Sequence, residues 1–202
     1  MNLVREQFGD IDIYLFDQIL KGRIRPGMRI LDAGCGGGRN LVYLLGEGFD
    51  VFAADVSAEA VAAVRAMGAG LPDSNFRVEP VQAMTFPDGC ADVVILSAVL
   101  HFASDDAEFG SMLMGAWRVL RPGGLLFCRL ASTIGVEGEV VGLGERRYRL
   151  MDGSERYLVD AELLREWTGR LGAELADPIK TTVVQDLRAM TTWVMWKGEG
   201  KV

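Results

Sequence analysis

Glycines and acidic residues that could bind a nucleotide-like ligand lie near the start of the chain. The segment LDAGCGGGRN, residues 31–40, joins a predicted strand to a predicted helix through a glycine-rich turn. Glycine lets the backbone turn sharply and approach a ligand closely, and the first N–H groups of the following helix are free to bind it. Asp55 ends the next predicted strand, where a carboxylate can accept hydrogen bonds from ribose hydroxyls. The spacing predicts a nucleotide-type site at the carboxyl end of the first strand.

The same spacing disfavours a dinucleotide such as NAD. The dinucleotide fingerprint has a small residue five positions after its first glycine. Counted from Gly34, that position holds Arg39, whose bulky charged side chain fits poorly there. Asp55 also has a second interpretation, as a helix-capping aspartate. An NAD-type oxidoreductase is therefore the less favoured alternative.

The elements around these residues alternate in the manner of βα units around a parallel sheet. The predicted strands are residues 28–32, 51–55, 76–78, 92–97 and 125–130, followed by two closing strands at 180–184 and 189–196. The predicted helices are 39–46, 58–67, 105–120 and 161–171, and residues 11–20 have helical spacing as well. Ser57 and Asp160 are placed to cap two of them, and Pro122-Gly123-Gly124 is placed to end the third.

Three motifs in this order resemble class I S-adenosyl-L-methionine-dependent methyltransferases. LDAGCGGGRN and FAADVS are similar to the first two motifs of that family, and RVLRPGGLLF is similar to the helix end and strand that follow its active-site strand. The resemblance covers residues 28–130, about half of the chain. The stretch GGGRNLVYLLGEGFDVFAADVS looks most like the tellurite-resistance type of small-molecule methyltransferase.

The resemblance implies an α/β fold with a Rossmann-like, doubly wound, seven-stranded mixed sheet. Its strand order would be 3-2-1-4-5-7-6, with the last strand antiparallel. We expect a single methyltransferase domain over residues 1–202. Its parts would be an N-terminal helical cap (1–27), a cofactor-binding core (28–130), an excursion that could act as a lid (131–158), and a C-terminal helix with closing strands (159–202).

The resemblance also implies S-adenosyl-L-methionine as the cofactor. Asp32 would lie near its ammonium group, Asp55 would hold the ribose, and Ser97 would lie beside the sulfonium and the methyl group. Many relatives have Asp where Gln82 stands, and a neutral amide can still bond to the edge of adenine. The implied cofactor-binding residues are Tyr14, Asp32, Gly34, Cys35, Gly36, Arg39, Asn40, Asp55, Val56, Gln82, Ala83, Met84 and Ser97.

Several of these residues have an ordinary structural interpretation too. Cys35 and Met84 could simply fill the core. Arg39 and Asn40 could be plain first-turn residues, although an arginine there could also pair with the carboxylate of the cofactor. These alternatives remain open at the level of sequence.

The acceptor side has three candidate regions and no assigned catalytic residue. His101, the single histidine, follows the fourth strand and could act as a base, or could be satisfied by the backbone of a turn. The excursion around Arg146 and Tyr148 could cover the pocket and bind an anionic acceptor, or could be a solvated hairpin. Tyr14, in the N-terminal helical segment, could contact the cofactor or dock that segment on the core. Orientation of the acceptor alone can supply roughly 7–11 kcal/mol. No general base is strictly required when the acceptor is soft or already anionic.

Composition limits the partners. With 21 Lys+Arg against 28 Asp+Glu, the net charge is −7, which argues against a nucleic-acid substrate and favours a small-molecule acceptor. The sequence lacks a signal-peptide pattern, and its apolar runs are too short to cross a membrane. The three cysteines form no metal-binding pattern, and we find no paired carboxylates for magnesium.

We therefore expect a cytoplasmic enzyme with no metal, no membrane and no nucleic-acid partner, as a monomer or a homodimer. Its function would be in-line transfer of a methyl group to a small molecule. The alternative from another class is a non-catalytic module or partner subunit that binds S-adenosylmethionine or S-adenosylhomocysteine. The intact glycine turn and Asp55 would serve cofactor binding in either case.

Overall fold

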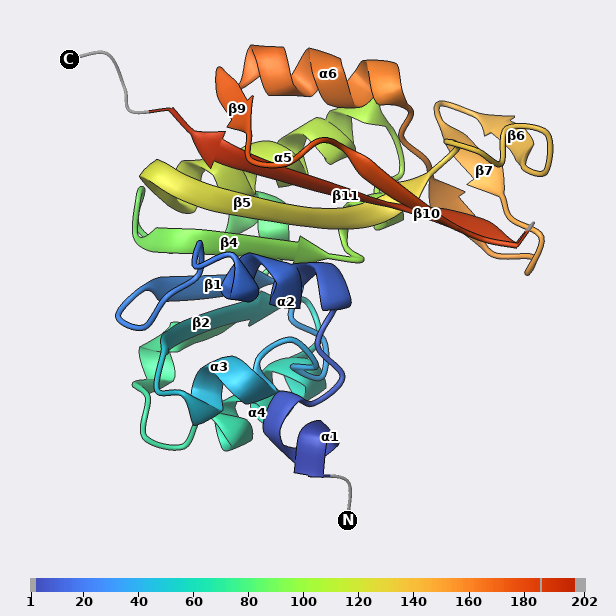
Figure 1. Cartoon of the computed structure of the whole chain (residues 1–202). Helices are drawn as coiled ribbons and strands as arrows, with labels where there is room; N and C mark the ends of the chain where they lie inside the picture. The colour runs from blue at the N-terminus through green and yellow to red at the C-terminus, as the bar shows by residue number, and fades with distance from the viewer. Residues whose placement is uncertain (1–2, 186, 199–202) are drawn as a thin grey trace.

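The computed structural model describes residues 3–185 and 187–198 and has one large sheet with helices on both faces (Figure 1). The order β3-β2-β1-β4-β5-β11-β10 confirms the expected order, and β11 is antiparallel to β5 as expected. A short strand that the sequence did not predict, β9, pairs with β11 beside this path. The strands are β1 (Arg29–Ala33), β2 (Asp50–Asp55), β3 (Phe76–Val78), β4 (Ala91–Ser97), β5 (Leu120–Ser132), β9 (Ala173–Leu175), β10 (Lys180–Val184) and β11 (Arg188–Lys197).

Two hydrophobic clusters fasten the helices to opposite faces of this sheet. Residues of α2, α3 and α4 pack with β1 and β2 in one cluster, and residues of α5 and α6 pack with β4 and β5 in the other. A first helix, α1, was not predicted and has no buried residue. The helices are α1 (Leu3–Phe8), α2 (Ile13–Leu20), α3 (Val42–Gly46), α4 (Ala58–Met67), α5 (Asp106–Val119) and α6 (Ala161–Arg170), with short 3₁₀ turns η1 (Asp73–Asn75), η2 (Val81–Ala83) and η3 (Leu100–Phe102). None of the helices in the described ranges is long and apolar enough to cross a membrane.

The predicted caps are present, and two predicted boundaries are wrong. Ser57 and Asp160 accept backbone hydrogen bonds at the starts of α4 and α6, as expected. The helix expected from residue 39 begins only at Val42, because residues 34–41 form successive turns instead. Pro122-Gly123-Gly124, which we expected to separate the helix from the fifth strand, lies inside β5. There the pairing shifts from Ala91–Leu120 to Val93–Leu125, so residues 121–124 are accommodated as a bulge.

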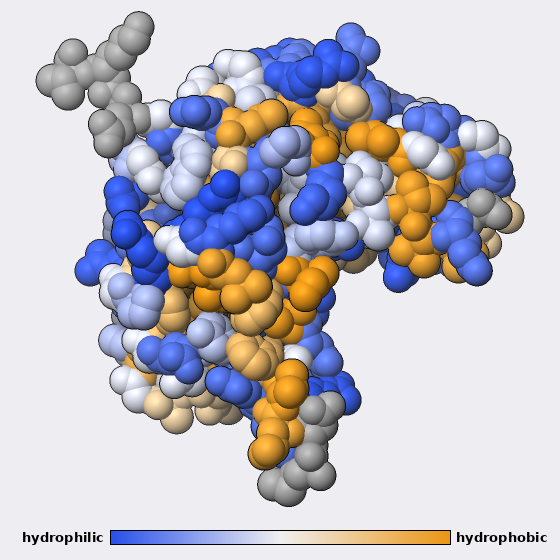
Figure 2. Space-filling model, viewed as in Figure 1, coloured by the Kyte–Doolittle hydropathy of each residue, from blue (hydrophilic) through white to orange (hydrophobic). Residues whose placement is uncertain are grey.

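The excursion after β5 forms a second, three-stranded antiparallel sheet. It consists of β6 (Val141–Gly144), β7 (Arg147–Arg149) and β8 (Glu155–Tyr157). The β7–β8 pair is a hairpin of the kind expected in this excursion, with Asp152-Gly153 in its turn, while β6 was not predicted. In Figure 1 this small sheet lies beside the end of the large one, and in Figure 2 the surface is hollowed below it.

Candidate functional site

A cavity of about 470 Å³ lies at the carboxyl ends of the parallel strands. This volume is in the range of small-molecule and cofactor sites. Its wall is built from the glycine turn after β1, the residues that follow β2, β3 and β4, η3, and the first turns of α5. Among the residues expected at the cofactor, the wall includes Gly34, Cys35, Gly36, Arg39, Asn40, Asp55, Val56, Gln82 and Ser97.

The glycine turn is held against β2 by its own backbone. The N–H groups of Gly34 and Cys35 donate to the carbonyl oxygen of Ala54, at 2.7 and 3.0 Å. Gly34 has φ of +82°, and a Cβ atom there would lie 2.5 Å from a methyl carbon of Val99, so only glycine fits. At Gly36 a Cβ would meet nothing within 4 Å, so the space beside it is open to a ligand.

Asp55 links the glycine turn to the end of β2. Its Oδ2 accepts from the N–H of Gly36 and its Oδ1 from the N–H of Ser57, each at 2.9 Å. The cap of α4 is Ser57, so Asp55 is not the N-cap that its second interpretation expected. Each carboxylate oxygen can accept more than one hydrogen bond, so both keep capacity for ribose hydroxyls. The next side chain, Val56, is 72% exposed on the cavity wall, which suits contact with a flat base.

Asp32 is a buried carboxylate at the end of β1, just before the glycine turn. Neither of its oxygens has a hydrogen-bond partner within residues 3–185 and 187–198. Burial raises the pKa of Asp32 to about 7; the positive charge of Arg39 acts against this rise, and the negative charge of Asp55 adds to it. A buried, unpartnered carboxylate costs free energy, which a cationic ligand group would recover. Asp32 itself is not part of the cavity wall.

Arg39 crosses the cavity wall to the end of β4. Its Nη2 donates to Oγ of Ser97 at 2.8 Å and lies 3.9 Å from Oδ2 of Asp12. Asn40 accepts from the backbone N–H of Asp12 at 3.0 Å, which ties the start of α2 to the glycine turn. The two residues are therefore more than first-turn surface groups, since both connect separate elements around the cavity.

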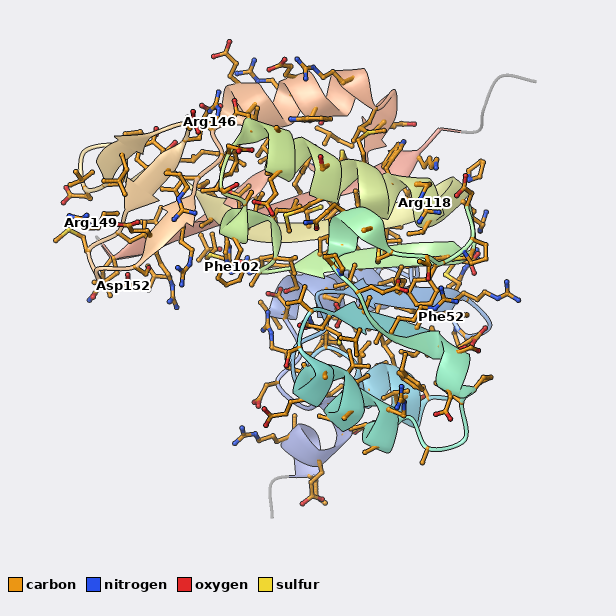
Figure 3. All side chains as sticks on the ribbon, turned by 180° about the vertical axis from the view of Figure 1, so that it is seen from behind. Phe52, Phe102, Arg118, Arg146, Arg149 and Asp152 are labelled. Atoms are coloured by element: carbon orange, nitrogen blue, oxygen red, sulfur yellow. The ribbon has the colours of Figure 1, made fainter. Side chains whose placement is uncertain are left out.

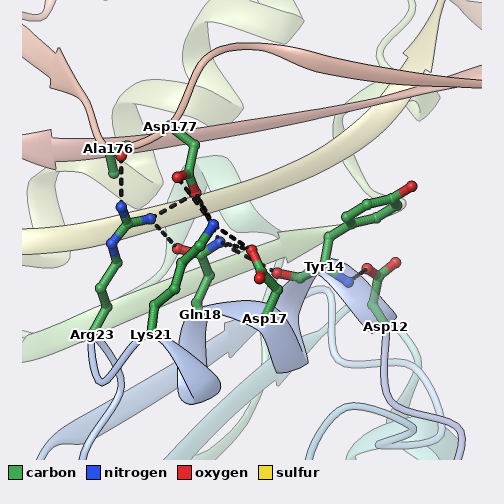
Figure 4. Close-up of polar contacts among 8 residues, drawn as sticks. All are labelled: Asp12, Tyr14, Asp17, Gln18, Lys21, Arg23, Ala176 and Asp177. Atoms are coloured by element: carbon green, nitrogen blue, oxygen red, sulfur yellow. Dashed lines mark hydrogen bonds and ion pairs between the residues drawn. The ribbon is translucent and has the colours of Figure 1, made fainter.

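Tyr14 lies outside the cavity wall and docks α2 on the closing strands. Its hydroxyl forms a 2.7 Å hydrogen bond with Oγ1 of Thr182, and its ring lies between the charges of Arg129 and Lys180, at 4.6 and 4.9 Å from the centroid. Arg129 also pairs with Asp12 at 2.8 Å. Figure 4 shows Tyr14 and Asp12 at the start of α2. The docking interpretation of Tyr14 matches this geometry.

Of the segment expected to flank adenine, residues 82–84, only the first residue lines the cavity. Gln82 lines the wall, whereas Ala83 is exposed outside it and Met84 is buried in the core. Gly115 of α5 fixes this segment, because a Cβ at that position would lie 2.3 Å from the carbonyl oxygen of Val81. The close approach of α5 to η2 therefore positions Gln82.

None of the three acceptor candidates lines the cavity. His101 is buried, and its Nδ1 accepts from the backbone N–H of Ala131 at 3.3 Å. Burial, and then the charge of Arg156, lowers the pKa of His101 to about 4, so the ring is neutral at pH 7. Arg146 pairs with Asp160, and Tyr148 packs against the small cluster of Ala131, Leu150 and Leu158.

The wall also includes residues that sequence reasoning missed. Glu79, Ala98 and Val99 come directly after β3 and β4, so their place after a strand was a usable signal. Phe102 in η3, with Glu108 and Met112 on α5, reaches the cavity only through tertiary packing. No sequence pattern marks that second group.

The cysteines and acids near the cavity bear on two kinds of chemistry, thiolate reactivity and metal binding. All three cysteines are free, and burial raises the pKa of Cys35 on the wall, which keeps it a neutral thiol. Within the described part of the chain, no group of three or more His, Cys, Asp or Glu side chains could hold a metal ion.

The residues fit the cofactor that the sequence implies. The open space at Gly36, the carboxylate of Asp55 and the exposed Val56 suit a nucleoside, and the unpartnered Asp32 beneath the turn suits an ammonium group. Gly36, Asp55 and Val56 line one cavity, and Asp32 is buried just before the glycine turn that forms part of its wall.

Comparisons with known proteins agree with this geometry. A family model described as a methyltransferase domain matches residues 31–128. A methyltransferase of Synechocystis sp. is 33% identical over 102 residues, 50% of this chain and 46% of that protein. The 2-methyl-6-phytyl-1,4-hydroquinone methyltransferase of Synechocystis sp. is 36% identical over 104 residues, 50% of this chain and 31% of that protein. The matches thus span less than half the length of these relatives.

A solved structure extends the likeness to the whole fold. The crystal structure of a S-adenosylmethionine-dependent methyltransferase from Methanosarcina mazei has a TM-score of 0.69 and 20% identity, and the match covers 89% of this chain and 97% of that one. With the matched domain, the sheet order and these relatives, the chain belongs to the class I S-adenosylmethionine-dependent methyltransferases, whose cofactor is S-adenosylmethionine.

Proposed function

We propose that this protein transfers a methyl group from S-adenosylmethionine to a small-molecule acceptor by in-line displacement. The observation that carries the proposal is the pair Asp32 and Asp55 on either side of the glycine turn, one unpartnered and buried, the other fixed on the cavity wall. We assign Asp32 to the ammonium group, Asp55 to the ribose and Val56 to the adenine face. Ser97, held by Arg39, would lie beside the reacting methyl group.

The chain's own contribution is binding, orientation and exclusion of water. The bound cofactor supplies an electrophilic methyl group on its sulfonium. The cavity would align the nucleophile of the acceptor with that methyl group, and such alignment can supply roughly 7–11 kcal/mol. Two carboxylates on the wall already accept hydrogen bonds, Glu79 from Thr85 and Glu108 from Ser104, and His101 is buried and accepts one from the backbone. We therefore propose an acceptor that is nucleophilic without a protein base.

The class of acceptor rests on charge and on the size of the cavity. The relatives differ here, because one is named for a hydroquinone and another for a tRNA nucleotide. The net charge of −7 disfavours a nucleic-acid backbone, and the cavity of about 470 Å³ has the size of a small-molecule site. We propose a small molecule, in a protein that works in the cytoplasm as one domain, as a monomer or homodimer. The narrower likeness to the tellurite-resistance type stays a prediction.

Calorimetric titration tests the cofactor assignments. S-adenosylmethionine should bind the native chain, and Asp55→Ala should weaken binding roughly ten- to a hundredfold through the loss of charge-assisted hydrogen bonds. Asp73→Ala is the control, because Asp73 is exposed and paired with Arg65 away from the cavity. Equal binding by Asp55→Ala would contradict the assignment. Tight binding without methyl transfer to any acceptor in a broad screen would favour the non-catalytic binding module.

A further inference from the structure

Phe102 is a large aromatic side chain left facing the cavity. It is 60% exposed and lies in the cavity wall, whereas its neighbours Leu100 and His101 in η3 are buried. The 3₁₀ turn that buries these two side chains directs the third outward. Figure 3 shows Phe102 between the large sheet and the small sheet that carries Arg149 and Asp152. An exposed ring at this position provides a flat apolar surface for a ligand.

Arg156 of β8 covers this ring. Its guanidinium carbon lies 5.0 Å from the centroid of Phe102, within the range of a cation–π contact. The small sheet is tied to the same turn by a second arginine, since Nη1 of Arg147 donates to the carbonyl oxygen of Ala103 at 3.1 Å. The charge of Arg156 therefore lies against a ring of the cavity wall, on a sheet that a second contact ties to the same turn.

The charge of Arg156 has no carboxylate partner within residues 3–185 and 187–198, unlike the other arginines of the small sheet. Arg146 pairs with Asp160 and Asp106, and Arg147 and Arg149 pair with Glu155. Among the described residues, the Arg156 guanidinium donates one hydrogen bond, from Nη1 to the carbonyl oxygen of Glu155 at 2.8 Å.

Neighbouring titratable groups do not replace that missing partner. Hydrogen bonds from Ser154 lower the pKa of Asp152 first, and the charges of Arg156 and Arg188 lower it further at longer range. His101, on the other side, is neutral at pH 7. A half-buried guanidinium over a ring in the cavity wall thus retains donors for an incoming anion.

We propose that Phe102 and Arg156 select an acceptor with a flat apolar body and a carboxylate, such as an aromatic or conjugated acid. The apolar body would lie on Phe102, and the carboxylate would pair with the guanidinium of Arg156. One guanidinium matches the charge and the two-oxygen geometry of a single carboxylate. This inference rests on the proposed function, because it concerns the acceptor of that same cavity.

Matched acids and amides test the proposal, since an amide has the shape of a carboxylate without its charge. The probes are benzoate, cinnamate and 1-naphthoate with their primary amides, titrated into protein saturated with S-adenosylhomocysteine. The acids should bind about tenfold tighter than the amides. Arg156→Met should abolish this preference, and Arg149→Met, an exposed and paired arginine of the same sheet, should retain it. Phe102→Leu should weaken the binding of the acids and of the amides by the same factor.

Two outcomes distinguish a failure of this inference from a failure of the proposed function. If S-adenosylhomocysteine itself does not bind, the proposed function is overturned and the acceptor inference with it. If it binds, but acids and amides bind equally, neither binds, or the preference survives in Arg156→Met, only the acceptor inference is overturned. Thermal unfolding of both methionine variants confirms that the comparison is between folded proteins.

Discussion

The two sides of the cavity are built in different ways. On the cofactor side, backbone groups of consecutive residues make the site: glycine N–H groups, strand ends and a carboxylate held by two N–H groups. On the acceptor side, the side chain of Phe102 in η3 lines the cavity and contacts Arg156 of β8, a residue from a distant segment. A site made of backbone groups is encoded by one stretch of sequence. A site made of side chains from distant segments forms only when the fold is complete.

The largest effect should come from the cofactor side, at Gly34. Gly34→Ala adds a Cβ 2.5 Å from Val99 at a φ of +82°, which should combine about 1–2 kcal/mol of backbone strain with about 1–3 kcal/mol of overpacking. Denaturant unfolding should show a loss of about 4 kcal/mol, and cofactor binding should fall below detection. Gly46→Ala is the control, because its Cβ would meet nothing and its φ is ordinary. If Gly34→Ala lost no more free energy of unfolding than Gly46→Ala, the glycine turn would tolerate a side chain at residue 34.

The next effect concerns the start of α2, which contacts β5 and β10 outside the cavity wall. Asp12→Ala would leave Arg129 without its carboxylate in a site where both side chains are mostly buried. We expect a loss of about 3 kcal/mol in the free energy of unfolding, the scale for breaking a buried pair from one side. The double variant Asp12→Ala/Arg129→Met should recover part of this loss. A double-mutant cycle without coupling would show that the pair does not hold α2.

A smaller effect is expected where the end of α2 meets the loop before β10 (Figure 4). Burial raises the pKa of Asp177, but hydrogen bonds from Arg23, Gln18 and Lys21 outweigh it and bring the pKa to about 2. Because this pKa is lower in the folded chain than in the unfolded one, its stabilisation is present above about pH 4 and is lost as the pH falls through 2.

The loss should be about 2 kcal/mol over that window, measured by denaturant unfolding at several pH values. Asp177→Asn should show a smaller decline over the same window. A decline of the same size in native and variant chains would place the acid sensitivity elsewhere.

The smallest effect returns to the cofactor side, at Asp32. Its pKa of about 7 means that a large fraction carries a proton at pH 6.5, and an ammonium ligand would favour the ionised form. Cofactor binding at pH 6.5 should therefore release up to about one proton, measured by calorimetry in buffers of different ionisation enthalpy. The Asp32→Asn variant should release fewer protons when the cofactor binds. Equal proton release would remove Asp32 from the ammonium site.

The difference between the two sides also explains what the sequence could predict. The glycine turn and Asp55 follow from motifs carried by consecutive residues, and the strand order follows from the family resemblance that these motifs indicate. Tyr14, for which contact with the cofactor and docking on the core were both open, connects α2 to β10 through contacts with two cations and a threonine from distant strands. Phe102 and Arg156 are more than fifty residues apart and carry no pattern that pairs them.

Short elements were missed for a related physical reason. β9 has three residues and is stabilised by its pairing with β11, while α1 has no buried face to produce an amphipathic pattern. In Figure 2 apolar side chains gather over α1 and α2, where Leu3, Val4, Ile13 and Leu20 are exposed. Their exposure explains why periodicity alone does not locate α1.

A crystal structure of the complex with S-adenosylhomocysteine tests the central claim most directly. We expect the ribose hydroxyls within hydrogen-bond distance of Asp55, the ammonium group over Asp32, and the sulfur beside Ser97. Density for the ligand outside this cavity, or a ribose bound without contact to Asp55, would contradict the assignment of the site.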